Sequence, residues 1–236
     1  MNIFVKILFW GQNFLFPGFC SLCECSLIGA DEIKYGLCDK CRFSIEPVHG
    51  IKCGKCGKPL ISEIDTCLPC RNSEHSYDRL WVLFPYTGKY KKLLTAYKFK
   101  KRRSLVHFFT DKISKIISDN PVLNDAVIVP VPPRPGKIKD IGWDQVEYLV
   151  KHLEKIKGLL PVNRCLKRRK SKVQKNLNRK DRLENLKDRI YINGSVPQTA
   201  LIIDDVITTG STMEVCAKAL KDSGAKTVYG LCLFYD

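Results

Sequence analysis

Short apolar runs alternate with amphipathic segments from residue 76 to the end of the chain. The apolar runs have the length and the β-branched or aromatic content of buried strands, and we place strands at residues 80–86, 126–131, 199–204 and 227–234. The segments between them have helical spacing, at residues 90–105 (a basic helix with a loop), 106–117, 143–157 and 211–223. The alternation of strand and helix predicts an α/β domain with an open parallel sheet over residues 76–236.

Residues 20–75 have a different texture, with many glycines and prolines and few apolar runs. Such a segment buries too little apolar surface to fold unaided, so we expect a small domain held together by metal ions. Residues 1–19 are apolar, with Lys6 as their charged residue, and predict a short N-terminal helix. Gly11 and Pro17 interrupt this run, which disfavours stable insertion in a membrane. Because no cleavage site follows the run, we expect a reducing, cytoplasmic location.

The spacing of the cysteines predicts metal binding. Eight of the twelve cysteines form four Cys-x-x-Cys pairs: Cys20/Cys23, Cys38/Cys41, Cys53/Cys56 and Cys67/Cys70. Each pair can bring two thiolates to one tetrahedral ion, so the four pairs can supply two closed, structural Zn²⁺ sites. We favour sequential pairing, in which the first two pairs share one ion and the last two pairs share the other. Two alternatives stay open, namely cross-braced pairing and Cys25 in the place of Cys23.

The most specific motif joins the strand at 199–204 to the helix at 211–223. Asp204 and Asp205 end the apolar run, and two residues later comes a loop rich in hydroxyl groups: Thr208, Thr209, Gly210, Ser211 and Thr212. Glycine permits a tight turn close to a ligand, and the N–H groups at a helix N-terminus favour phosphate. Carboxylates beside a phosphate suit a ligand that also carries sugar hydroxyls and Mg²⁺. The loop lacks the Gly-Lys-Ser/Thr of a Walker motif.

The formal net charge of +16 comes from two segments. Residues 89–103 hold eight basic residues and no acid, and residues 164–189 hold twelve basic residues against three acids. Residues 1–75 are balanced, with eight charges of each sign. Two basic segments beside a phosphate loop predict a polyanionic ligand, although each could also be the solvated face of a helix.

The loop with its preceding acids resembles the signature of the type I phosphoribosyltransferases: four apolar residues, two acids, two apolar residues, then Thr-Thr-Gly-x-Thr. The resemblance implies 5-phosphoribosyl-1-pyrophosphate (PRPP) with Mg²⁺ as ligand. It assigns Asp204 and Asp205 to the ribose hydroxyls and residues 208–212 to the 5-phosphate. It also implies a pyrophosphate loop after an earlier strand, where Pro132, Pro133 and Arg134 stand.

Over nearly its whole length the chain resembles the ComF family of late-competence proteins. The resemblance rests on the tandem Cys-x-x-Cys pairs and on a series of short motifs: Tyr86-Thr-Gly88, Tyr97-Lys-Phe-Lys100, Pro130-Val-Pro132 and Gly142-Trp-Asp-Gln145. Ile141 and Asp144 depart from the family pattern, which has arginine and asparagine at these positions.

The family resemblance implies a role in natural transformation, in which single-stranded DNA is handled in the cytoplasm after uptake. Basic residues with interleaved aromatics suit this ligand, although at least half of the aromatics are expected to pack in the core. The expected DNA contacts are Lys98, Lys100, Lys101, Arg102, Arg103, Lys167, Arg168, Arg169, Lys170, Lys172 and Arg182. Two other functions stay open: an active phosphoribosyltransferase with an unidentified base or amine acceptor, and a docking protein for competence helicase or recombination factors.

Overall fold

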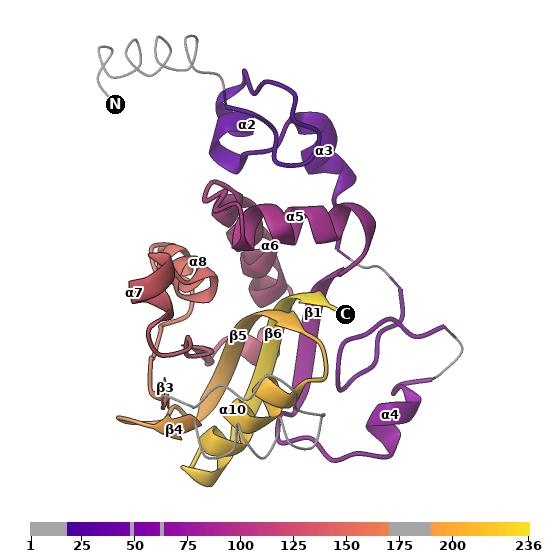
Figure 1. Ribbon diagram of the computed structural model, residues 1–236. Coiled ribbons are helices and arrows are strands. Elements are labelled where there is room, and N and C mark those ends of the chain that lie inside the picture. Colours follow the sequence, from indigo (N-terminus) through magenta and orange to yellow (C-terminus); the bar gives the residue numbers. More distant parts are fainter. Residues whose placement is uncertain (1–17, 48–49, 62–63, 170–189) are drawn as a thin grey trace. The chain divides into compact units, whose positions relative to one another are not determined.

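The computed structural model describes residues 18–47, 50–61, 64–169 and 190–236 (Figure 1). Nearly all of the expected helix at 1–19 lies outside these residues, as do three of the expected DNA contacts: Lys170, Lys172 and Arg182. The chain divides into two compact units, one formed by Met1–Glu46 with Thr87–Asp111 and the other by Pro47–Tyr86 with Lys112–Asp236. The boundary separates the first two cysteine pairs from the last two, whereas the sequence predicted one domain over residues 20–75.

The second unit is built on a parallel sheet, which confirms the expected α/β class. Among the described residues, four strands pair in the order β1-β6-β5-β2, and all neighbours are parallel. The strands are β1 (Arg79–Pro85), β2 (Val127–Pro130), β5 (Thr199–Ile207) and β6 (Thr227–Tyr235). β5 is interior, and its carboxyl end is where an open parallel sheet presents its loops to a ligand.

Helices cover both faces of this sheet. Alternate residues of β5, Ala200 and Ile202, share a buried cluster with Met213 of α10 (Ser211–Asp222). Leu201 and Ile203 point the other way because side chains alternate along a strand. α8 (Gln145–Leu153) packs on β2 and β5, and its buried residues lie outside the cluster that contains α10, so α8 covers the opposite face.

Gly230 of β6 allows α10 to lie close to the sheet. A Cβ atom at this position would lie 2.5 Å from Leu80 Cδ1 and 2.8 Å from Met213 Sδ. Both distances are shorter than ordinary contacts, and both neighbours are buried. The close approach of α10 to β6 therefore depends on the absence of a side chain at residue 230.

A short antiparallel hairpin, absent from the sequence-based prediction, completes the second unit. Its strands are β3 (Leu166–Arg168) and β4 (Ile190–Ile192). Leu166 and Ile190 are buried in the cluster that contains α10, whereas Lys167 and Tyr191 pair across the hairpin and are exposed. The unit also contains η1 (Pro121–Leu123), α7 (Lys137–Ile141) and α4 (Leu68–Arg71).

The segment that carries Cys53 and Cys56 is attached to β1, the outer strand of the described sheet. The N–H of Leu80 donates to the carbonyl of Lys55 at 2.8 Å. Gly57 has a φ of 69°, and a Cβ atom there would collide with the carbonyl oxygen of Leu80. The turn can therefore lie against the strand only with glycine at this position.

The first unit contains α2 (Ala30–Tyr35), α3 (Asp39–Ser44), α5 (Gly88–Lys98) and the first part of α6 (Leu105–Ser118). Lys89 donates to the carbonyl of Ser44, and Tyr35 Oη donates to Asp111 Oδ2 at 2.5 Å. Tyr97 is fully buried against Phe109, with the ring centroids 5.1 Å apart. The basic helix with a loop expected at residues 90–105 consists of α5, which ends at Lys98, and the loop that follows it. No helix among the described residues is long and apolar enough to cross a bilayer.

Candidate functional site

The hydroxyl-rich loop forms a pocket at the carboxyl end of β5. Its lining consists of Asp204, Val206, Ile207, Thr208, Thr209, Gly210, Ser211, Thr212, Met213 and Cys232. The pocket is partly open to solvent. All five loop residues predicted to bind phosphate therefore face one cavity, together with one of the two predicted acids.

The loop ends in a left-handed turn that begins α10. Gly210 is the N-cap residue, with a φ of 76°, a backbone conformation that residues other than glycine rarely adopt. The hydroxyls of Thr209 and Ser211 bond to each other at 2.8 Å. N–H groups and hydroxyls at the start of a twelve-residue helix are a favourable setting for an anion.

The two adjacent acids, Asp204 and Asp205, have different surroundings because side chains alternate along a strand. Asp204 is half-buried and lines the pocket, and its Oδ1 accepts the N–H of Asp205 at 2.8 Å. Asp205 is 6% exposed and accepts a hydrogen bond from Gln145 Nε2 at 2.6 Å. β5 runs on to Ile207, beyond the predicted end, because the apolar residues Val206 and Ile207 pair with β6. The contact of both acids with ribose hydroxyls stays a prediction.

A polar network connects Asp205 to the segment that follows the candidate pyrophosphate loop. Lys137 Nζ lies 2.6 Å from Asp144 Oδ2 and 2.5 Å from Gln145 Oε1. Asp144 also caps α8 by accepting the N–H groups of Val146 and Glu147. The departure from the family pattern at residue 144 therefore provides a carboxylate that caps a helix and pairs with Lys137. The network was not predicted from the sequence, although Asp144 and Gln145 lie in the motif at 142–145, which was the available signal.

The candidate pyrophosphate loop lies at the same edge of the sheet as the pocket at the end of β5. It follows β2, and the N–H of Val131 extends the pairing to β5 by donating to Ile203 at 3.0 Å. Pro132 is buried, Pro133 is half-buried and Arg134 is exposed. Ile141, the other departure from the family pattern, is 48% exposed at the end of α7. Binding of pyrophosphate by this loop stays a prediction.

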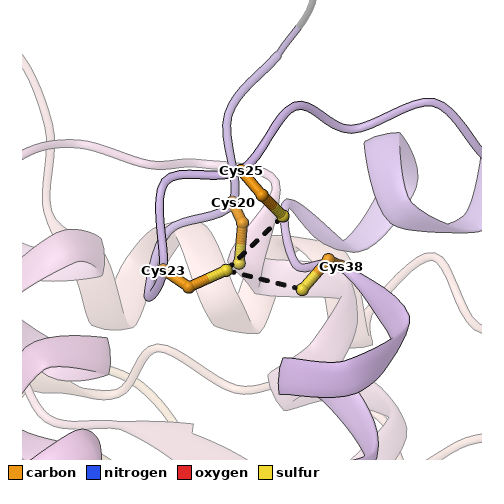
Figure 2. Close-up of side chains that lie close together, drawn as sticks. All are labelled: Cys20, Cys23, Cys25 and Cys38. Carbon is orange, nitrogen blue, oxygen red and sulfur yellow. Dashed lines mark hydrogen bonds between the residues drawn. The ribbon is translucent and has the colours of Figure 1, made fainter.

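The first cysteine group differs from the predicted ligand set. Sulfur atoms within 4.8 Å of one another belong to Cys20, Cys23, Cys25 and Cys38 (Figure 2). Cys25 thus joins Cys23 rather than replacing it, with the two sulfurs 3.4 Å apart. Cys41 lies beside the same group, within hydrogen-bonding reach of Cys23, Cys38 and Cys20. Burial and these contacts raise the pKa of its thiol. Five thiols therefore lie close together, whereas one tetrahedral ion takes four ligands.

The second cysteine group contains the four residues that sequential pairing predicted, Cys53, Cys56, Cys67 and Cys70, with all sulfurs within 4.8 Å. Burial opposes ionisation of Cys53, but N–H donors from Cys56, Cys67 and Lys55 outweigh it and lower the pKa of this thiol to about 6. Burial raises the pKa of Cys56 to about 11. Clustered sulfurs suit a dication that stabilises all four thiolates, so both groups fit a structural Zn²⁺ ion.

Three further cysteines outside these groups are buried as expected: Cys165, Cys216 and Cys232. Cys232 lines the pocket at the end of β5, but burial together with Asp204 and Asp205 raises the pKa of its thiol well above the usual value. A thiol with a raised pKa is a poor nucleophile at neutral pH.

The predicted DNA contacts fall in both units. In the first unit Lys98 is half-buried and four residues are exposed: Lys100, Lys101, Arg102 and Arg103. Phe99 between them is 67% exposed. In the second unit Lys167 and Arg169 are exposed and Arg168 is half-buried. Arg169 lies over the ring of Tyr191, 5.0 Å from the centroid. Tyr191, the cross-strand partner of Lys167, was not among the predicted contacts.

No protein-family model matches the chain. The chain is 27% identical to Competence protein F of Haemophilus influenzae over 171 residues, which cover 69% of this chain and 75% of that protein. It is 28% identical to Competence protein ComFC of Streptococcus pneumoniae over 152 residues, which cover 62% of this chain and 64% of that protein.

A shorter match relates the chain to a ribose-phosphate pyrophosphokinase of Staphylococcus aureus, at 47% identity over 49 residues. This match covers 20% of the chain and 15% of the kinase. It agrees with the phosphoribosyltransferase-like arrangement of a parallel sheet with a hydroxyl-rich loop after β5. The two competence-protein matches extend over most of the sequence and support membership of the ComF family.

Proposed function

We propose that this protein acts in natural transformation, where it binds a phosphorylated ribose such as PRPP and handles single-stranded DNA in the cytoplasm. The observation that carries the proposal is the pocket at the end of β5. Asp204 lies beside the hydroxyls of Thr209 and Ser211 and the N-terminus of α10. A ribose phosphate needs both kinds of group, an acceptor for its hydroxyls and donors for its phosphate.

The exposed face of the β3–β4 hairpin supports binding of single-stranded nucleic acid. Lys167 of β3 is exposed, and Tyr191 is its cross-strand partner. Arg169, directly after β3, is also exposed and lies over the ring of Tyr191. Cations neutralise the phosphate backbone, and an exposed ring offers a stacking platform to any base. Arg164, at the start of the basic segment, contributes less because Glu147 and Glu154 pair with it at 2.9 and 3.0 Å.

Fluorescence anisotropy of a labelled single-stranded oligonucleotide at near-physiological salt tests this proposal. A duplex of the same length and Mg²⁺–PRPP are the competitors. We expect saturable binding that prefers the single strand. Binding that disappears by roughly 200 mM salt, or that does not distinguish the two forms of DNA, would reduce the interaction to nonspecific charge.

Two variants at Tyr191 separate stacking from charge. Tyr191→Ala should lose about 1–3 kcal/mol of binding free energy, whereas Tyr191→Phe keeps the ring and should bind as the parent does. Lys167→Ala should make the slope of log binding constant against log salt concentration less steep, by less than about one unit. Equal affinities for the Ala and Phe variants would exclude a base stacked on this ring.

An active phosphoribosyltransferase is the second candidate function, favoured by the network that joins Lys137, Gln145 and Asp205. Such a network holds the candidate pyrophosphate loop and the acid pair in one arrangement, and catalysis by this class is largely positioning and charge stabilisation. The test is release of pyrophosphate from Mg²⁺–PRPP with nucleobases and amines as acceptors. Acceptor-dependent release would favour the enzyme, and tight strand binding without release would favour the first proposal.

A further inference from the structure

His75 connects the second cysteine group to the helix that follows the phosphate loop. Its Nε2 lies 3.4 Å from the sulfur of Cys70, and its Nδ1 lies 3.5 Å from Oε2 of Glu214 in α10. The imidazole stacks on Tyr77, with ring centroids 4.7 Å apart, and Tyr77 is 2% exposed. The ring is therefore held between a candidate metal ligand and a carboxylate of the phosphate-binding helix.

Glu214 has two carboxylate oxygens with different partners. Oε1 accepts hydrogen bonds from the N–H of Ser76 at 2.9 Å and from its hydroxyl at 2.5 Å. Oε2 is buried and, within the described part of the chain, accepts no hydrogen bond, and Nδ1 of His75 lies 3.5 Å from it. Burial of a carboxylate oxygen is unfavourable without a compensating partner, so the contact with His75 stabilises Glu214 in this position.

The position of Glu214 in turn matters to the phosphate loop. Its N–H donates to the carbonyl of Gly210 at 2.9 Å, and Gly210 is the residue at which the loop turns into α10. A carboxylate in the first turn of a helix repels an anion bound at the same N-terminus. Contact with His75 and Ser76 directs this charge toward the cysteine group and compensates it.

We propose that the second cysteine group and the phosphate pocket are coupled through His75 and Glu214, so that occupation of one site strengthens the other. The inference rests on the proposed phosphoribose pocket and makes His75 and Glu214 positioning residues for it. A metal ion at Cys53, Cys56, Cys67 and Cys70 would fix Cys70 and with it the imidazole. Since coupling is reciprocal, a ligand in the pocket must then slow loss of metal from this group.

Alkylation of the cysteines by N-ethylmaleimide in the presence of a chelator, read by mass spectrometry, tests this reciprocity in the full chain. Thiols react once their metal leaves, and peptide mapping distinguishes the second group from the first. Mg²⁺–PRPP should slow alkylation of the second group by about fivefold or more, the lower end of usual coupling between sites. The first group lies in the other unit and serves as the internal control, with no change expected.

Glu214→Gln removes the charge that faces His75 and keeps an oxygen that can accept from Ser76. In this variant the rate of alkylation of the second group should be about the same without and with Mg²⁺–PRPP, so that the ratio of the two rates is about one. The matched control is Asp222→Asn, which removes an exposed acid at the other end of α10, and the ratio should persist. A merely structural effect would change both rates together and leave their ratio intact. His75→Asn breaks the same connection from the other side and serves if the Gln variant is poorly folded.

Calorimetric titration with Mg²⁺–PRPP separates failure of the coupling from failure of the pocket. Bound PRPP with unchanged alkylation of the second group would overturn the coupling and leave the proposed phosphoribose pocket intact. A Glu214→Gln protein that keeps the parental ratio would overturn the route through this residue. Absence of PRPP binding to the parent protein would refute the proposed pocket and the coupling with it.

Discussion

Replacement of Gly230 by alanine gives a quantitative test of how α10 packs on the sheet. The added methyl group would meet Leu80 Cδ1 at 2.5 Å and Met213 Sδ at 2.8 Å, both well inside ordinary contact. Overpacking of this kind typically costs about 1–3 kcal/mol. Alanine in a strand recovers about 0.5–1 kcal/mol relative to glycine. We therefore expect Gly230→Ala to lower the free energy of unfolding by about 1 kcal/mol, the difference between the middles of these two ranges.

Urea denaturation of the metal-loaded protein, followed by far-ultraviolet circular dichroism, measures this loss as a lower transition midpoint. A second substitution tests the contact itself, because Leu80→Val removes the Cδ1 atom that the methyl group would meet. The double variant Gly230→Ala/Leu80→Val should be more stable than the sum of the two single effects by about 0.5–1 kcal/mol. Gly230→Ala should also weaken phosphate binding if the added methyl group displaces Met213, which lines the pocket.

A Gly230→Ala protein as stable as the parent would refute the close approach of α10 to β6. Additive effects in the double variant would mean that Leu80 does not meet the new methyl group. Loss of stability with unchanged phosphate affinity would indicate that the added methyl group displaces the side chain of Leu80 rather than that of Met213.

Three other predictions concern polar contacts and metal. Gln145→Ala removes a donor from buried Asp205 and should cost about 1–3 kcal/mol of stability, measured by urea denaturation, with Gln145→Asn as the control of reduced reach. Asp78 accepts the N–H of Val228 and pairs with Lys221; burial alone would raise its pKa, but these contacts outweigh burial and lower it. Its stabilisation should therefore be complete above the unfolded pKa and vanish as pH falls through the folded value, a dependence that Asp78→Asn should abolish in acid titrations of stability. Removal of metal with a strong chelator should lower the thermal midpoint and be reversed by Zn²⁺ but not by Mg²⁺, because thiolate ligands prefer the softer ion; an unchanged midpoint would argue against structural metal.

The strands and the position of the hydroxyl-rich loop after β5 were predictable because their signals are local. The run at 199–204 is apolar without interruption, and the acids and hydroxyl residues that follow have a fixed spacing. The extension of β5 to Ile207 was not predicted, because two acids in a buried strand contradict the usual composition of strands. The separation of Asp204 from Asp205 follows from the two-residue period of a strand, but only once both are known to lie inside it.

The parts of the site that the sequence analysis missed depend on contacts between distant residues. β3 and β4 are three residues each, too short for a periodic pattern, and a long basic segment separates them. His75 and Glu214 come together only because the second cysteine group is attached to the sheet that α10 covers. The sequence shows a fifth cysteine, Cys25, two residues after Cys23. Which of the five sulfurs come together depends on the turn at Cys20–Cys25, which the sequence does not specify.

The turn that contains Lys55 and Gly57 has a further consequence, since it lies on β1 at the outer side of the described sheet. A strand in that position offers its backbone to another chain, and such edges are common starting points for aggregation. The cysteine turn shields part of this edge by taking the N–H of Leu80. We therefore expect the second group to limit self-association, so that protein depleted of metal forms β-rich aggregates before it loses its secondary structure. Zinc supply during expression would then determine whether this protein is recovered as a monodisperse species.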